Sequence, residues 1–142
     1  MSVQATPYLT FNDNCREAMN YYKACFGGDL TLQTVAETPI AAQCPAGMQE
    51  HVMHSALSNN DFVIMATDMV GHRGFVNGTD MAISLNFDKE DETRKCFEKL
   101  STAGEVIDNL KESSWGSLFG VVKDKFGKVW MFNHELQAKP EG

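Results

Sequence analysis

The sequence lacks the features that mark several broad classes of protein. No apolar run approaches the ~20 residues that a membrane-spanning helix needs. No basic cluster occurs and the net charge is −7, so nucleic acid and anionic membranes are poor electrostatic partners. The four cysteines include no CxxC pair, which disfavours a disulfide framework or a cysteine-rich zinc site and favours buried or half-buried thiols.

Two further absences concern targeting and cofactors. The N-terminal stretch MSVQATPYLTF has no charged start followed by an apolar core, so no signal peptide is expected and a cytoplasmic location is predicted. The chain also has no glycine-rich strand-to-helix turn of the kind that nucleotide-type cofactors favour. Its 142 residues suit one domain, or two small modules that share a core.

The hydrophobic pattern predicts the same order of elements twice: strand, helix and three strands. Residues 36–50 hold two prolines and a glycine without any period, which predicts a long loop, either a lid or a dimer contact, or else a plain linker. Residues 134–142 are expected to fray. The predicted helices are 15–26 and 89–103, and the predicted strands are 7–11, 29–35, 51–58, 61–68, 81–87, 105–110 and the two arms of 115–133 around the turn DKFG.

An internal repeat supports this order. A shift of 76 residues places Phe11 on Phe87, and a shift of 66 residues, which allows for the longer first loop, places Met65 on Met131. One such module exposes a whole sheet face, whereas two packed modules can cover each other and leave a ligand pocket. The alternative is two unrelated hairpins that look alike by chance. The prediction is an α+β fold of two tandem βαβββ modules, residues 5–69 and 80–136, that form a curved mixed sheet around a cleft.

Several stretches that together cover most of the chain carry a family resemblance. They are PYLTFNDNCREAMNYYKACFGGDL (7–30), CPAGM (44–48), HSAL (54–57), FVIMATD (62–68) and WGSLFGVVKDKFGKVWMFN (115–133). With the repeat, the sequence resembles the vicinal oxygen chelate superfamily, which includes glyoxalase I, bleomycin-resistance proteins, extradiol dioxygenases and fosfomycin-resistance enzymes. It most resembles the PhnB-like branch, also labelled demethylubiquinone-methyltransferase-like. The resemblance implies a single glyoxalase-like domain over residues 1–142 and a homodimer.

The resemblance also implies where a metal would bind. Metal-dependent members take His, Gln or Glu ligands from the first and last strand of each module. Those positions fall here near Pro7 or Tyr8, near Ile83 or Ser84, and on Met65 and Met131. Hard divalent cations need oxygen or imidazole ligands, and thioether sulfur is a soft, weak donor. The resemblance therefore implies the fold and the pocket, and no metal or other cofactor is expected.

The polar candidates for chemistry are few. His51 and His54 are three residues apart, and on a strand they would point to opposite faces and could not share a metal. His54 is expected either to face the cleft as a base or hydrogen-bond donor, or to be a satisfied core or interface histidine. Glu50 and Asp68 are possible acid–base groups, with solvated carboxylates at strand ends as the default interpretation. Asp124 is expected to shape the DKFG turn.

The aromatic and sulfur-containing side chains suggest the ligand. Trp130 and Phe132 share one face of their predicted strand, and Met131 takes the other. Such aromatics either fill a core or line a pocket for a flat apolar ligand. Trp115 and Phe119 are the aromatic pocket candidates. The predicted ligand pocket consists of His54, Met65, Trp115, Phe119 and Met131, with the two methionines as an adaptable apolar floor.

The sequence thus predicts a metal-free protein that binds a small apolar or aromatic molecule of unknown identity, as a homodimer. It does not decide between sequestration of that ligand and a metal-free reaction. One alternative is a lyase, isomerase or dioxygenase that depends on a divalent metal in the same cleft. A dimeric scaffold without a ligand is the other. No nucleic acid or membrane partner is expected.

Overall fold

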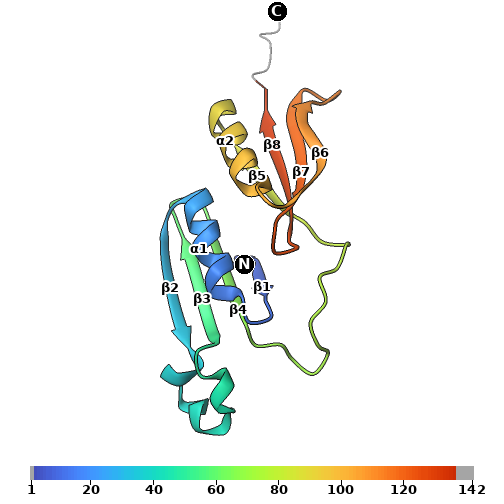
Figure 1. Ribbon diagram of the computed structural model, residues 1–142. Helices are drawn as coiled ribbons and strands as arrows, with labels where there is room; N and C mark the ends of the chain where they lie inside the picture. The colour runs from blue at the N-terminus through green and yellow to red at the C-terminus, as the bar shows by residue number, and fades with distance from the viewer. Residues whose placement is uncertain (1, 137–142) are drawn as a thin grey trace, which may run out of the picture. The chain divides into compact units, whose positions relative to one another are not determined.

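The computed structural model describes residues 2–136 and divides into two compact units, Met1–Val76 and Asn77–Gly142. Each unit contains one α-helix and its own four-stranded sheet (Figure 1). The first unit contains β1 (Tyr8–Thr10), α1 (Cys15–Phe26), β2 (Asp29–Thr34), β3 (Val52–Ser58) and β4 (Val63–Thr67). The second contains β5 (Ile83–Phe87), α2 (Glu90–Ser101), β6 (Glu105–Glu112), β7 (Ser117–Lys123) and β8 (Val129–Glu135).

The two sheets have the same topology. The strand order is β1-β4-β3-β2 in the first unit and β5-β8-β7-β6 in the second. In each, the first and last strands of the unit pair in parallel, and the other pairs are antiparallel. The α+β class and the repeated strand–helix–strand–strand–strand order that the sequence predicts are confirmed, with each unit building a mixed sheet.

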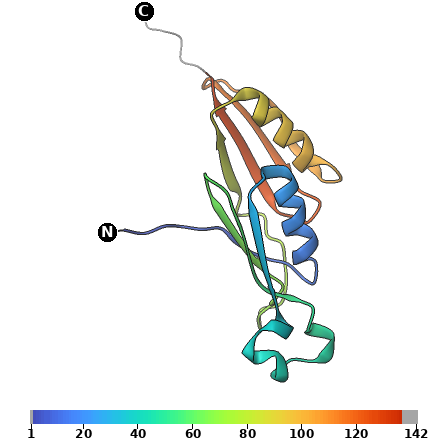
Figure 2. The ribbon, with the colours of Figure 1, turned by 90° about the vertical axis from the view of Figure 1, so that its left-hand side faces the viewer.

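Each helix covers one face of the sheet in its own unit, as Figures 1 and 2 show. In α1 the side chains of Cys15, Ala18, Met19 and Tyr22 are fully buried. These positions recur at three- and four-residue intervals, so they form the stripe that meets the sheet. The helix ends at Phe26 and is followed by Gly27, whose φ of 74° is in the left-handed region that favours glycine.

The core of the second unit is aromatic. Trp130 and Phe132 are fully buried, and the Phe132 ring lies 5.1 Å from the ring of Phe97 on α2. The predicted alternation on this strand is therefore correct, because Met131 between them is only partly buried. The Trp130 indole Nε1 donates a 2.7 Å hydrogen bond to Asp124, which leaves no buried indole N–H unsatisfied.

Residues 36–50 are not the irregular loop that the sequence predicts. Three short 3₁₀ helices lie between β2 and β3: η1 (Val35–Glu37), η2 (Pro39–Gln43) and η3 (Ala46–Met48). The Gln49 side-chain amide donates to the carbonyls of Ala41 at 2.9 Å and Cys44 at 3.2 Å, which ties this segment together. Such short turns leave no 3.6-residue period in a sequence, so the hydrophobic pattern missed them.

The C-terminal prediction was partly wrong. His134 and Glu135 belong to β8 rather than to a frayed tail, and residues 137–142 lie outside the described part of the chain. Between residues 2 and 136, neither helix is long and apolar enough to cross a membrane.

Candidate functional site

Each sheet has a second face that carries no helix of its own unit within the described residues. In the first unit, Ser55 is buried against α1, with its Oγ 3.5 Å from the Cys15 Sγ. Because side chains alternate along a strand, His54 and Ala56 on β3 face the other way. Met65 is the register partner of Ala56 and joins them. We call this surface the open face of the first unit.

His54 has polar neighbours on this face. The Tyr8 hydroxyl lies 3.5 Å from His54 Nδ1, and the two rings are tilted with centroids 5.9 Å apart. Gln33 is the direct cross-strand partner of His54 on β2. Tyr8 is 52% exposed, and His54 is partly buried. A Tyr8 hydroxyl that donates to Nδ1 leaves the Nε2–H of a neutral His54 free to donate to a ligand.

Sequence reasoning missed Tyr8 and Gln33 as neighbours of His54. Tyr8 reaches this face because β1 pairs in parallel with β4, a strand more than fifty residues later, where Tyr8 is the partner of Met65. Local pattern does not determine the register of such a distant pair. The sequence did carry one signal for Gln33. Polar and apolar residues alternate in β2, which places Thr31 and Gln33 on the same face of the strand.

The open face of the second unit is more apolar. Gly120 lies on the helix side of β7, since a side chain there would run into the Phe97 ring of α2. Phe119 and Val121 therefore face away from α2, together with Met131, the register partner of Val121. The Trp115 ring meets the Phe119 ring edge-on with centroids 5.5 Å apart. Trp115 is 65% exposed, which is unusual for an indole.

The predicted pocket residues thus fall into two groups. His54 and Met65 share the open face of the first unit. Trp115 contacts Phe119, which shares the open face of the second unit with Met131. An amide pair borders this second group, with Asn133 Nδ2 donating to Asn86 Oδ1 at 3.2 Å, and Asn133 is the register partner of Phe119.

The positions that the resemblance assigns to metal ligands do not fit a divalent ion. Tyr8 and Met65 are register partners, as are Ser84 and Met131, so each pair lies side by side on the open face of its unit. Their donors are a phenol, a hydroxyl and two thioethers, whereas hard divalent ions take carboxylate, imidazole or carbonyl ligands. Residues 2–136 contain no group of three His, Cys, Asp or Glu side chains that could hold a metal ion.

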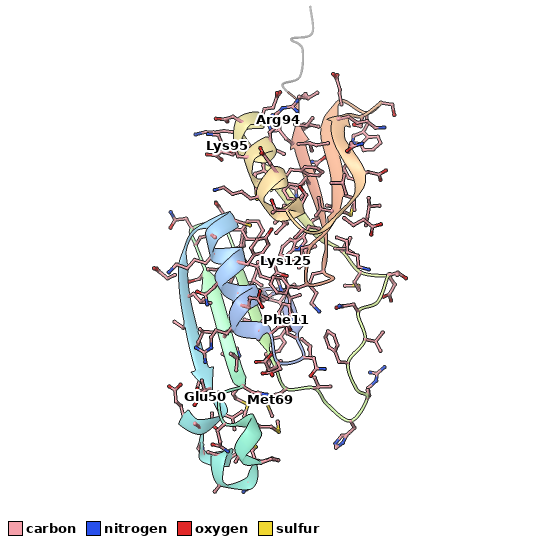
Figure 3. All side chains as sticks on the ribbon, viewed as in Figure 1. Phe11, Glu50, Met69, Arg94, Lys95 and Lys125 are labelled. Atoms are coloured by element: carbon pink, nitrogen blue, oxygen red, sulfur yellow. The ribbon has the colours of Figure 1, made fainter. Side chains whose placement is uncertain are left out.

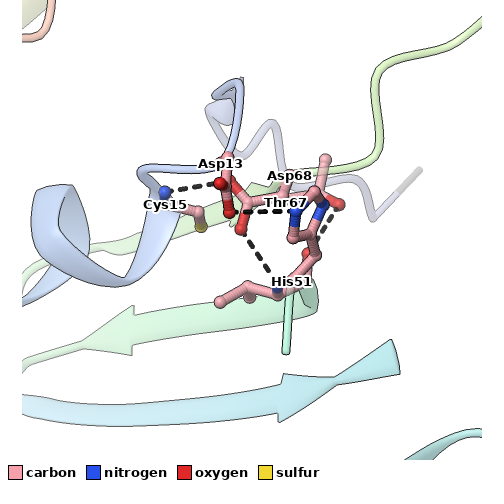
Figure 4. A network of polar contacts seen from close by, with 6 residues as sticks. Asp13, Cys15, His51, Thr67 and Asp68 are labelled. Atoms are coloured by element: carbon pink, nitrogen blue, oxygen red, sulfur yellow. Dashed lines mark hydrogen bonds and ion pairs between the residues drawn. The ribbon is translucent and has the colours of Figure 1, made fainter. Parts of the chain in front are cut away.

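Asp68 is a buried structural carboxylate, contrary to the prediction of a solvated one. It is 5% exposed and accepts backbone N–H bonds of 2.9 Å from both Cys15 and Val52 (Figure 4). The first of these bonds caps α1, because the N-cap residue Asn14 makes no side-chain capping bond. Asp68 therefore joins the start of α1, the start of β3 and the end of β4.

His51 lies outside the open face. It precedes β3, and its Nε2 lies 3.0 Å from a carboxylate oxygen of Asp13, a residue with a φ of 67° (Figure 4). Its backbone carbonyl accepts a 2.9 Å bond from Val35 N. His51 and His54 thus have different partners and different locations.

The buried cysteine of α1 is not a nucleophile at neutral pH. Burial raises the pKa of the Cys15 thiol to about 11, and the hydrogen bond with Ser55 only partly offsets that effect. The thiolate is the reactive form of cysteine, so the neutral thiol here is inert. Within residues 2–136 no cysteine forms a disulfide, and Cys96 is buried as well.

A polar hollow lies at the start of α2. It is lined by Asp88, Lys89, Glu90, Asp91, His134 and Glu135. His134 Nδ1 is 3.0 Å from the Phe87 carbonyl, so a neutral ring donates there and leaves Nε2 as an acceptor. The acidic side chains that line the hollow are those expected at a solvent-exposed helix start, because negative charge is favourable at the N-terminus of a helix.

The comparisons with known proteins agree on one family over most of the chain. Residues 3–132 match the profile of the 3-demethylubiquinone-9 3-methyltransferase family. The protein YjdN of Escherichia coli strain K12 is 30% identical over 138 residues, which cover 90% of this chain and 92% of YjdN.

Solved structures share the fold. Protein PA1353 from Pseudomonas aeruginosa matches with a TM-score of 0.82 and 34% identity, over 96% of this chain and 100% of that one. A putative 3-demethylubiquinone-9 3-methyltransferase, PhnB protein, from Bacillus cereus matches with a TM-score of 0.70 and 23% identity, over 93% and 99% of the two chains. A structure from the glyoxalase/bleomycin resistance protein/dioxygenase family and one of a glyoxalase-related enzyme also have this fold.

Proposed function

Because the chain belongs to the PhnB-like, 3-demethylubiquinone-9 3-methyltransferase family with a glyoxalase/bleomycin-resistance fold, we propose that it binds a small apolar or aromatic molecule without a metal ion. Each open face is a surface for such a molecule by itself, with His54 and Met65 as the contacts in the first unit and Trp115, Phe119 and Met131 in the second. Sequestration of such a ligand requires no catalytic residue.

The observation that carries the proposal is the pairing of strand positions. The resemblance assigns a metal to the first and last strands of each module, and these strands are direct neighbours here. A methionine occupies the last-strand position in both pairs, Met65 in one and Met131 in the other. Methionine is flexible and polarizable, so it suits contact with an apolar ligand far better than coordination of a hard cation.

Two features support an aromatic ligand with few polar groups. The exposed Trp115 ring and the Phe119 ring it touches can stack on a flat molecule. The polar groups on the open face of the first unit, Tyr8, His54 and Gln33, can supply a small number of orienting hydrogen bonds. A few placed polar groups on an apolar surface are typical of small-molecule sites.

A homodimer in the cytoplasm is part of the proposal. The resemblance implies the dimer, and β6 supports it as an edge strand with two exposed apolar residues, Val106 at 41% and Ile107 at 50%. Exposed apolar edge strands pair readily with another chain. Light scattering tests this part, and a monomer at high protein concentration would contradict it.

Tryptophan fluorescence tests ligand binding directly. Trp115 is largely exposed, whereas Trp130 is fully buried and hydrogen-bonded, so a bound aromatic molecule should change chiefly the emission of Trp115. We expect saturable changes with flat aromatic probes such as 2-naphthol, and their loss in Trp115→Phe. A panel of such probes that leaves the emission unchanged, in protein shown to be folded, would contradict binding.

A further inference from the structure

Asn77, the first residue of the second unit, is held by both ends of its side-chain amide. Its Oδ1 accepts a 2.7 Å hydrogen bond from the Lys128 Nζ, and its Nδ2 donates a 3.1 Å bond to the Phe126 carbonyl. The amide also lies against Gly127, where even a single added carbon would run into it. We call this set of contacts the Asn77 clasp.

The turn that the clasp holds is itself rigid. Asp124 Oδ1 accepts backbone bonds from Phe126 at 2.8 Å and Lys128 at 3.1 Å. Its other oxygen accepts the Trp130 indole at 2.7 Å. The partners of Asn77 are therefore fixed in place, and the connection after β4, drawn in yellow-green in Figure 1, is fastened to the β7–β8 turn at Asn77.

The residue after Asn77 makes this fastening chemically labile. Gly78 is exposed, and its backbone N–H has no hydrogen-bond partner among residues 2–136. An asparagine followed by glycine can cyclise, since glycine places no side chain in the way of the peptide nitrogen. The nitrogen of Gly78 bonds to Cγ of Asn77 and loses its proton to solvent, while the bond from Cγ to Nδ2 breaks and ammonia leaves. Water then opens the succinimide to aspartate or isoaspartate.

The clasp opposes this reaction. Cyclisation requires Cγ of Asn77 to turn toward the Gly78 nitrogen, which breaks the bonds to Lys128 and Phe126. The bond from Lys128 is charge-assisted and therefore the stronger of the two. Burial lowers the pKa of the Lys128 ammonium, and the charge of Asp124 opposes that shift. The amide can react only in the fraction of molecules where the clasp is open.

We propose that Asn77 is a site of spontaneous deamidation that the Asn77 clasp holds back. The reaction converts an amide and water into a carboxylate and ammonium, so it needs no other reactant. The product keeps an acceptor for Lys128 but has no donor for the Phe126 carbonyl, and its negative oxygen would face that carbonyl. The clasp therefore does not re-form in its original geometry. Deamidation of Asn77 irreversibly releases the connection after β4 from the β7–β8 turn.

Peptide mapping after incubation at mildly alkaline pH in heavy-oxygen water tests the proposal. Trypsin releases residues 74–89 as one peptide, which contains both Asn77 and Asn86, and fragment ions separate the two. We expect heavy oxygen at residue 77, with isoaspartate among the products, slowly in the folded protein and much faster in urea. Gly78→Ala should suppress the reaction in urea, which identifies the succinimide route.

The decisive variants change the clasp without touching Asn77 or Gly78. Lys128→Met removes the charge-assisted bond and should accelerate deamidation of the folded protein by about tenfold. Lys95→Met, on the exposed side of α2 (Figure 3), is the matched control and should leave the rate unchanged. Equal rates in Lys128→Met and the parent would overturn the proposal. So would folded parent protein that reacts as fast as protein in urea, a comparison that holds even if Lys128→Met does not fold.

Discussion

At the scale of single residues, the carboxylate of Asp68 does the most to join distant parts of the first unit. It accepts two backbone N–H groups, one at the start of α1 and one at the start of β3. An unsatisfied buried N–H is costly, so this residue has a structural role that its place beside a strand end did not reveal.

The substitution Asp68→Asn measures that role. The amide oxygen can serve only one of the two donors, and the amide NH₂ would face the other, so we expect a loss of about 2 kcal/mol in the free energy of unfolding. Urea denaturation is the measurement. Asp29→Asn, at an exposed position of β2, is the control and should stay within about 0.5 kcal/mol of the parent. A similarly small change at Asp68 would contradict this account.

The residues of the candidate site show how far sequence reasoning extends. Alternation correctly separated Met131 from Trp130 and Phe132, because the period of a strand is a local property. The contact between Tyr8 and His54 and the burial of Asp68 both depend on pairs that are distant in sequence, β1 with β4 in the first case and Cys15 with Asp68 in the second. No local pattern reports those pairs, so the neighbours of His54 were missed and the solvation of Asp68 was wrong.

At the scale of elements, both units have the same close contact between two backbone segments, at the point where the helix leads into the sheet. A side-chain carbon on Gly28, just after α1, would lie 2.5 Å from the Ser58 carbonyl at the end of β3. Gly104, just after α2, similarly abuts the Lys123 carbonyl at the end of β7. The shift of 76 residues relates these two glycines, so each helix leads into its sheet through the same tight contact.

Alanine substitutions test that equivalence. Gly104→Ala should lower the free energy of unfolding by about 2 kcal/mol, because backbone must move to admit the methyl group. Gly28→Ala should cost at least as much, since its φ of 107° is also strained for alanine. Gly47→Ala, with nothing within 4 Å, is the control in the same urea experiment. Equal free energies of unfolding for Gly104→Ala and Gly47→Ala would contradict the view that the contact with the Lys123 carbonyl requires glycine at position 104.

The boundaries of elements were predicted best where the signal was local. The first helix begins at Cys15 and ends at Phe26 as predicted, because its apolar stripe and the following glycines define it. The segment between β2 and β3 was misread, since three short 3₁₀ helices leave no long period. Their arrangement depends on contacts such as those of the Gln49 amide, which a pattern of single residues does not encode.

At the scale of the whole molecule, the chain consists of two units with the same sheet topology. One fold can carry many unrelated functions. The fold alone therefore does not identify a reaction. The side-chain donors at the positions assigned to metal ligands determine whether a metal can bind. In both units the last strand places a methionine beside the first strand, where the resemblance assigns a metal ligand. This doubled thioether is the central reason for proposing an apolar, metal-free site.

Elemental analysis of protein purified without any chelator tests that claim most directly. The account predicts far less than one divalent ion per chain, and no gain in bound zinc, nickel, manganese or iron after incubation with each metal and desalting. Binding of 2-naphthol should be the same with and without a chelator. One tightly held divalent ion per chain, lost together with ligand binding when the chelator is added, would contradict the account.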